Sequence, residues 1–180
     1  MLEYRRSGVG FIRSHDMSAI KDYVASAVLI GTAATAMLDI WTLARQWLFH
    51  TAAADYGLVG RWIGHMAWGR FRHDSIAASS PIAGERVIGW TAHYLIGIAF
   101  AFALLALWGI DWAQHPTLAP ALIVGIGSVV APFLLMQPGM GAGIAASRTA
   151  NPAAARVRSI VTHGIFGVCL YAAAWTVTLL

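Results

Sequence analysis

The stretch RVIGWTAHYLIG, residues 86–97, returns seventy residues later as RVRSIVTHGIFG, residues 156–167. A small residue also lies four positions before the histidine in both copies. Positions four apart share one face of an α-helix. Each copy therefore predicts a helix with a small residue, a histidine and a glycine in one stripe, and an arginine two turns before the histidine. The matching pairs are Arg86 and Arg156, Val87 and Val157, His93 and His163, and Gly97 and Gly167.

The similarity extends to the loops that precede both copies. The tetrapeptide IAAS occurs at residues 76–79 and again at 144–147, and a proline lies between it and the arginine each time. This order predicts two tandem units of two helices each, over residues 19–110 and 117–180. Two spans return the chain to its starting side, so the units share one orientation and a pseudo-twofold axis along the membrane normal.

The composition indicates an integral membrane protein. Of 180 residues, 58% are hydrophobic and 11% charged, and the mean hydropathy is +0.65, whereas soluble domains carry about 25% charged residues. Four apolar runs reach the roughly 20 residues that a spanning helix needs. We therefore predict an all-α fold with four transmembrane helices, at about residues 23–49, 87–109, 119–136 and 159–180. The third run contains Pro132 and ends at the segment QPGMGAG, residues 137–143, whose glycines predict a break, a turn or a close backbone approach to another element.

The first long loop begins with an amphipathic segment at helical spacing, about residues 56–72. This pattern predicts a helix in the membrane interface, with Trp at headgroup depth and Arg toward phosphates. The side chains can bind anionic lipid headgroups or a phosphate-bearing substrate, or act as ordinary interfacial anchors. The candidates are Arg61, His65, Arg70, Arg72, His73, Trp62 and Trp68.

Residues 1–18 form a polar tail unlike the rest of the chain, and residues 1–16 are expected to be an over-extended reading frame or a poorly ordered segment. Lys and Arg concentrate in the loops at about residues 50–85 and 138–158. Since positively charged loops stay inside, these loops are predicted to be cytoplasmic and both termini periplasmic.

Several stretches resemble a known family: GRWIGHMAWGRFRHDSI, ERVIGWTAHYLIGI, PFLLMQPGMGAGIAASRTANP and THGIFG. They are similar to the signature stretches of the DUF2938 family of bacterial inner-membrane proteins, over nearly everything after about Met17. The resemblance implies a small polytopic inner-membrane protein. It implies no activity and carries over no catalytic residues.

The two matching histidines are the main site candidates. If the repeat axis passes between their helices, His93 and His163 can face each other and ligate a haem iron, hold a transition metal with Asp39, Met136 or Met140, or relay protons. The alternative is hydrogen bonding between helices. Asp39, inside the first apolar run, is expected to pair with one of these histidines or with Arg45. The polar-site candidates are His93, His163, Asp39, Gln137, Arg86 and Arg156.

No enzyme signature is present: the chain has no HExxH, GxSxG, P-loop or paired-Cys motif. We therefore name no catalytic residue and expect a non-enzymatic protein. The hypotheses are a small permease-like transporter with a polar site at the repeat interface, a haem- or metal-binding redox protein using His93 and His163, and an accessory subunit of a membrane complex. The expected partners are membrane lipids and further copies of the chain in a homo-oligomer, and no nucleic acid.

Overall fold

The computed structural model describes residues 3–50 and 54–178, with the backbone alone for residues 3–18. All regular structure within these residues is helical. Four segments are long and apolar enough to cross a membrane: Ala19–Phe49, Glu85–Trp108, Leu118–Met140 and Pro152–Val177. The prediction of an all-α protein with four membrane-spanning helices is confirmed.

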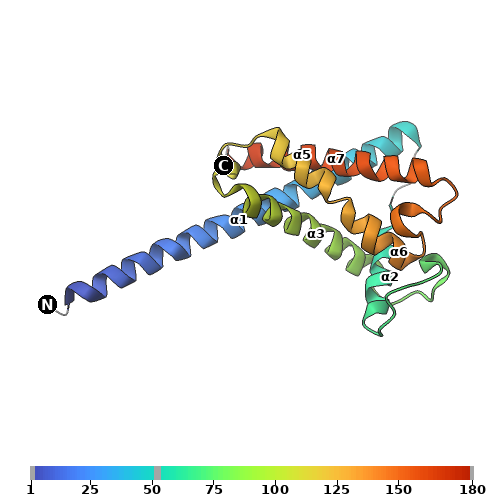
Figure 1. The fold of residues 1–180 in the computed structure, drawn as a ribbon, viewed down its shortest axis with the longest axis horizontal. Helices are drawn as coiled ribbons and strands as arrows, with labels where there is room; N and C mark the ends of the chain where they lie inside the picture. Colours follow the sequence, from blue (N-terminus) through green and yellow to red (C-terminus); the bar gives the residue numbers. More distant parts are fainter. Residues whose placement is uncertain (1–2, 51–53, 179–180) are drawn as a thin grey trace.

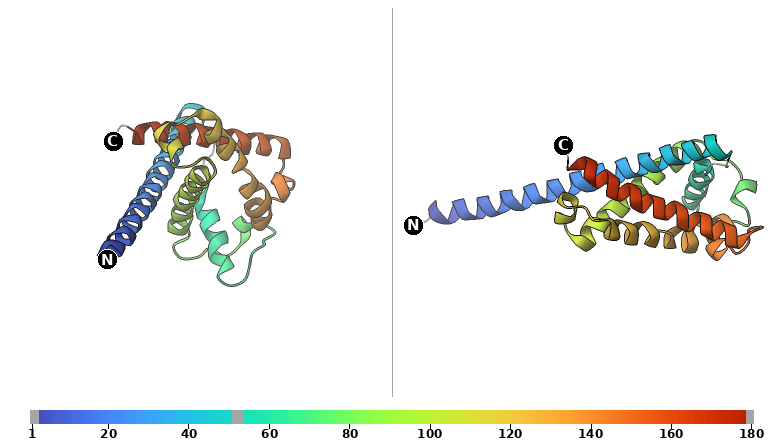
Figure 2. Two further views of the ribbon diagram at one scale, coloured as in Figure 1. Left: turned by 60° about the vertical axis from the view of Figure 1, so that its left-hand side comes forward. Right: turned by 90° about the horizontal axis from the view of Figure 1, so that it is seen from above.

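The long helices form a bundle in which each one contacts two others (Figures 1 and 2). Helix α1 (Glu3–Phe49) packs on α3 (Glu85–Trp108) and on α7 (Pro152–Val177). Helix α5 (Leu118–Gly127) packs on α7 and touches α3. The contacts thus run from α3 to α1, from α1 to α7 and from α7 to α5, and in chain order the four helices form two pairs, α1 with α3 and α5 with α7. That these pairs arose by tandem duplication stays a prediction.

The N-terminal segment differs from the sequence-based expectation. Residues 3–18, expected to be a poorly ordered polar tail, continue α1 as helix. This part of α1 projects beyond the bundle (Figure 1). No proline interrupts residues 1–49, so the helix of the first span can extend backward through them.

Both helix pairs cross at glycines. A side chain at Gly97 would strike the hydroxyl of Thr35, and one at Gly31 would overlap the backbone of α3. In the second pair, a side chain at Gly125 would strike the backbone of Gly167. Without these side chains the two backbones meet directly, which is how small residues hold membrane helices together.

The apolar core lies in the half of the bundle that contains the short helix α4 (Asp111–Gln114). Its largest fully buried apolar side chains are Ile30, Leu104, Leu105 and Leu170. The opposite half carries α2 and the two long loops (Figure 1). Most of the polar side-chain contacts are therefore found toward the loop end, away from the best-packed region.

Helix α2 (Tyr56–Met66) packs closely across the first turns of α3. Asp55 caps its N-terminus by accepting a hydrogen bond from the backbone N–H of Gly57, at 2.9 Å. The predicted end near residue 72 is wrong, because the helix ends at Met66. Gly69 adopts the left-handed conformation there (φ +74°), and the N–H of Arg70 bonds back to the carbonyl of His65.

The two IAAS tetrapeptides lie at the same end of the bundle, although Ala145 and Ala146 of the second one have positive φ and the matching residues of the first do not. Each begins with a single 3₁₀ turn, η1 (Ile76–Ala78) in the first loop and η3 (Ile144–Ala146) in the second. Residues of both loops line one cavity. The expectation that both loops lie on one face of the protein therefore holds for the fold.

The third span is discontinuous, and its interruption begins earlier than the glycine-rich segment at residues 137–143, where a break was predicted. After α5 the chain passes through a turn at Ser128 and Val129 and a π-helical turn, η2 (Pro132–Met136), before the short helix α6 (Gln137–Met140). Pro132 has no N–H to donate to the preceding turn. The glycine-rich segment then packs closely: Gly139 lies against the indole of Trp62.

Candidate functional site

A hydrogen-bonded cluster joins three helices inside the bundle; we call it the Asp39 cluster, and it consists of Asp39, Tyr56, His93 and Tyr94. The Nε2 atom of His93 lies 3.0 Å from one carboxylate oxygen of Asp39. The hydroxyl of Tyr94 donates to the other oxygen at 3.1 Å. The hydroxyl of Tyr56 lies 3.2 Å from the same Nε2 atom. The expectation that Asp39 pairs with a histidine or with Arg45 is thus resolved in favour of His93.

The bonding pattern determines which of these groups donate and which accept hydrogen bonds. A carboxylate can only accept hydrogen bonds, so ionised Asp39 accepts one from the N–H of His93 and one from the hydroxyl of Tyr94. The carboxylate and the imidazole are both 15% exposed. A carboxylate among apolar helices is costly unless it is paired. The cluster therefore supplies Asp39 with the partners that burial requires.

Aromatic rings enclose the imidazole of His93. The ring of Tyr56 stacks on it with centroids 4.2 Å apart, and Trp90 meets it edge-on at 5.8 Å. Burial raises the pKa of the Tyr56 hydroxyl, and the nearby Asp39 and Tyr94 raise it further. Tyr56 therefore stays a neutral hydrogen-bonding group at neutral pH.

The second histidine has a simpler environment. The Nδ1 atom of His163 lies 2.6 Å from the hydroxyl oxygen of Ser128, and this hydroxyl donates to the carbonyl of Gly125 at 2.5 Å. Because the serine proton is used in that bond, Nδ1 of His163 is the donor to Ser128. His163 thus bonds to α5 next to the break in the third span and has no carboxylate partner in the described part of the chain.

The structure does not bring His93 and His163 together as a pair. They lie on α3 and α7, and no bond or ring contact between them occurs in residues 3–50 and 54–178. No group of three or more His, Cys, Asp or Glu side chains in these ranges can hold a metal ion. The two histidines are thus not in contact within these ranges, and each bonds to a neighbouring helix, as in the alternative of hydrogen bonding between helices.

The remaining polar candidates lie apart from the Asp39 cluster. Arg86 is exposed at the start of α3, and the Nε atom of Arg156 donates to the carbonyl of Ala145 at 2.8 Å. The side-chain oxygen of Gln137 and the Nε atom of Arg45 are buried without a hydrogen-bond partner in the described residues. Asp39 and His93 thus meet within α1, α2 and α3, in the first predicted unit, and not at the interface between the two units where the polar site was predicted.

Two of the predicted lipid-headgroup residues on α2 point inward. Arg61 forms a two-bond ion pair with Glu85, each bond 2.8 Å long, and also donates to loop carbonyls. His65 is buried, with Nε2 2.9 Å from the carbonyl of Ser80. Trp62 donates to the carbonyl of Phe71 at 3.0 Å. These three side chains hold the first loop against the bundle, whereas Trp68 is 70% exposed.

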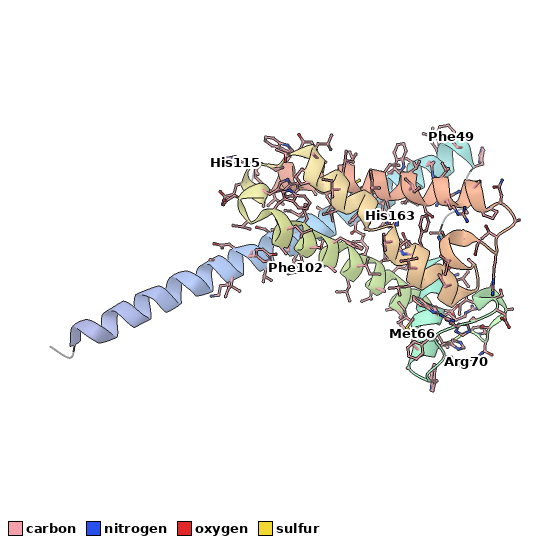
Figure 3. All side chains as sticks on the ribbon, in the orientation of Figure 1. Phe49, Met66, Arg70, Phe102, His115 and His163 are labelled. Atoms are coloured by element: carbon pink, nitrogen blue, oxygen red, sulfur yellow. The ribbon has the colours of Figure 1, made fainter. Side chains whose placement is uncertain are left out.

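Arg70 and Arg72 line a cavity of about 790 Å³ between the two IAAS loops. The cavity also contains His73, a member of the same predicted set, and Arg148, which was not among the candidates selected from the sequence. Figure 3 places Arg70 at the loop end of the bundle, opposite His115. The clustering of basic residues in each loop was visible in the sequence, but their common cavity was not.

Among the contacts of the Asp39 cluster, sequence reasoning missed Tyr56 and Tyr94. Tyr94 follows His93 directly, and a polar tip beside a candidate histidine is a signal that sequence inspection can use. Tyr56 comes from another helix, so only the fold reveals its role. Sequence reasoning also did not identify Ser128 as the partner of His163.

The comparisons with known proteins identify the family and leave its activity open. No curated protein and no solved structure matches the chain. The profile of one family, described as "Protein of unknown function (DUF2938)", matches residues 28–177. This range contains all four crossing segments except the N-terminal part of the first one. The chain therefore belongs to the DUF2938 family of proteins of unknown function.

Proposed function

We propose that this integral membrane protein is a small permease-like transporter in which the Asp39 cluster takes up and releases a proton. The observation that carries the proposal is the Asp39–His93 pair, which lies on two helices that are long and apolar enough to cross a membrane. Ionisable groups at such positions commonly form ion pathways and proton relays. Histidine is suited to this role because its proton exchanges near neutral pH.

The depth of the pair supports this role. Asp39 is ten residues before the end of α1, which corresponds to about 15 Å along the helix. His93 is eight residues after the start of α3, or about 12 Å. Both side chains therefore lie well inside their helices, beyond the depth at which a terminal side chain easily reaches headgroups.

The interrupted third span also favours transport. Discontinuous membrane helices expose backbone groups where substrates or ions bind, and irregular backbone at membrane depth is tolerated where it lines a cavity or is buried in protein. Here the break at Ser128 contacts His163, and a π-helical turn follows. π-helical turns within helices often occur at functional sites.

The proposed location is the bacterial inner membrane, with both IAAS loops in the cytoplasm. Seven arginines in the loop end support this orientation through the positive-inside rule. They are Arg61, Arg70, Arg72, Arg86, Arg148, Arg156 and Arg158. Reporter fusions at Ser80 and Asn151 should both give cytoplasmic signals, and a periplasmic signal from either would overturn the orientation.

Proton flux into vesicles tests the proposal. Purified protein is reconstituted in liposomes that contain a pH-sensitive dye, and a pH gradient is imposed in the presence of a K⁺ ionophore. We expect flux above that of empty liposomes, and Asp39→Asn should reduce it to the empty-liposome rate. Asp39→Glu, which keeps the carboxylate, should retain part of it. Flux equal to that of empty liposomes in the unaltered protein would contradict the proposal and favour an accessory-subunit role.

A further inference from the structure

The cavity between the two IAAS loops has the chemistry of an anion site. Three arginines line it, Arg70 and Arg72 from the first loop and Arg148 from the second, together with one carboxylate, Asp74. The lining is therefore net positive. None of the three guanidinium groups forms an ion pair or a side-chain hydrogen bond within the described residues. Their donors are thus available to a ligand.

The lack of such contacts within the described residues distinguishes these three arginines from other basic side chains at the same end of the bundle. Arg61 is committed to Glu85, and Arg156 donates to a loop carbonyl. Three unpaired guanidinium groups around one cavity repel each other, and an anion between them removes that repulsion. Arginine is also the side chain best matched to phosphate, because its planar fork donates two parallel hydrogen bonds.

Further polar groups complete the lining. The hydroxyls of Ser80 and Ser147 belong to it and can donate to phosphate oxygens. His73 also lines the cavity and is only 8% exposed. Its Nδ1 atom lies 3.0 Å from the hydroxyl of Ser79, and its Nε2 atom has no partner in the described residues.

An apolar groove of about 290 Å³ adjoins this cavity and shares Arg72 and Pro138 with it. Its other lining residues are almost entirely apolar, and among them Phe71 and Leu135 are 59% and 66% exposed. A basic cavity beside an apolar groove matches a molecule with a phosphate group and a hydrocarbon chain. A free phosphate would leave the groove unused.

We propose that the cavity between the IAAS loops binds a phosphate group, and that an anionic phospholipid supplies it, with its acyl chain in the adjoining groove. The site requires both loops, because the first contributes Arg70 and Arg72 and the second contributes Arg148. A phosphate group bound there links the two helix pairs at their loop end. This inference is independent of proton uptake at the Asp39 cluster.

Native mass spectrometry of the detergent-purified protein tests the site with two probes, dioleoyl-phosphatidylglycerol and inorganic phosphate. The test variants are Arg72→Gln and Arg148→Gln, one in each loop. The matched control is Arg158→Gln, which removes the same charge from an exposed position at the same end, outside the cavity. Thermal unfolding of each variant shows that it is folded.

We expect phosphatidylglycerol to bind, and each test variant to weaken binding by about tenfold, the effect of losing a charged hydrogen bond. Arg158→Gln should change it less than twofold. Binding of inorganic phosphate with the same variant pattern, and no preference for the lipid, would retain the phosphate site but overturn the lipid as its source. Equal effects of Arg148→Gln and Arg158→Gln, or no binding of either probe, would overturn the site.

Discussion

His93 and His163 occupy the same offset in two similar helices, yet their chemical surroundings differ. His93 bonds to a carboxylate that also accepts from Tyr94, and its ring is stacked on Tyr56. His163 bonds to the hydroxyl of Ser128. The first helix pair therefore contains a carboxylate–imidazole pair, whereas the second contains a hydroxyl–imidazole bond next to a broken helix.

The difference arises on the helix that each histidine faces. In both pairs a hydroxyl side chain bonds back to the carbonyl of the crossing glycine: Thr35 to Gly31 at 2.7 Å, and Ser128 to Gly125 at 2.5 Å. Beyond that point the pairs diverge, because Asp39 lies one further turn along α1. Matching positions in these two similar helices thus share packing but need not share chemistry.

Enlarging the crossing glycines should give the largest effect and should affect both pairs alike. Gly97→Val places a side chain against buried Thr35, and Gly167→Val places one 2.8 Å from the carbonyl oxygen of Ala121. We expect each variant to lose about 3 kcal/mol of stability, measured by thermal unfolding in mild detergent.

Gly164→Val is the control for α7, because the nearest atom to an added side chain is 3.9 Å away. It should cost less than about 1 kcal/mol. If this control lost as much stability as Gly167→Val, the close crossing would not be what holds the second pair together.

Removal of the hydrogen-bond partners of the two histidines should destabilise the two helix pairs to different extents. Asp39→Ala leaves His93 and Tyr94 without their acceptor, so we expect a loss of about 2 kcal/mol. Ser128→Ala removes one neutral bond and should cost about 1 kcal/mol. The measurement is again thermal unfolding, with Asp39→Asn as the variant that keeps an acceptor. A larger loss for Ser128→Ala than for Asp39→Ala would reverse the comparison.

The smallest effect should come from His73, outside both pairs. Burial lowers the pKa of His73 below the ordinary 6.5, and the neighbouring His65 and Arg70 lower it further. Asp74 is the next residue in the chain. The unfolded chain therefore takes up a proton before the folded one does, so stability is lost as pH falls through the ordinary value. Unfolding at about pH 7 and about pH 5 should show this loss, below about 1.4 kcal/mol per pH unit.

His73→Gln should reduce the change of stability with pH. The change that remains then comes from the other titrating groups, including those of the two helix pairs. A pH profile identical to that of the unaltered protein would show that His73 does not contribute.

Much of the fold follows from the sequence, because hydropathy and length determine which segments can cross a membrane. The four spans and the location of both IAAS loops at one end were predicted in this way, whereas the interruption at Ser128 and Val129 was not. The end of α2 was not, because it depends on the left-handed conformation of Gly69. The continuation of α1 through residues 3–18 was also missed, since polar composition says little about helix length.

The candidate site was predicted less completely. Sequence position identified Asp39 and His93 as candidates and their pairing as one of three alternatives. The rotation of each helix about its axis decides which side chains meet, and spacing along one helix does not contain that information. For the same reason Arg148, 76 residues after Arg72, could not be placed in the same cavity before the fold was known.

Proton flux in liposomes with His93→Gln and His163→Gln, measured side by side, tests the central claim most directly. Both variants remove an imidazole from the same offset of a similar helix, so the comparison isolates the surroundings. We predict that His93→Gln lowers flux to the rate of empty liposomes, while His163→Gln keeps most of it. Equal loss in both variants, or loss only in His163→Gln, would contradict the claim that the Asp39 cluster is the proton-exchanging site.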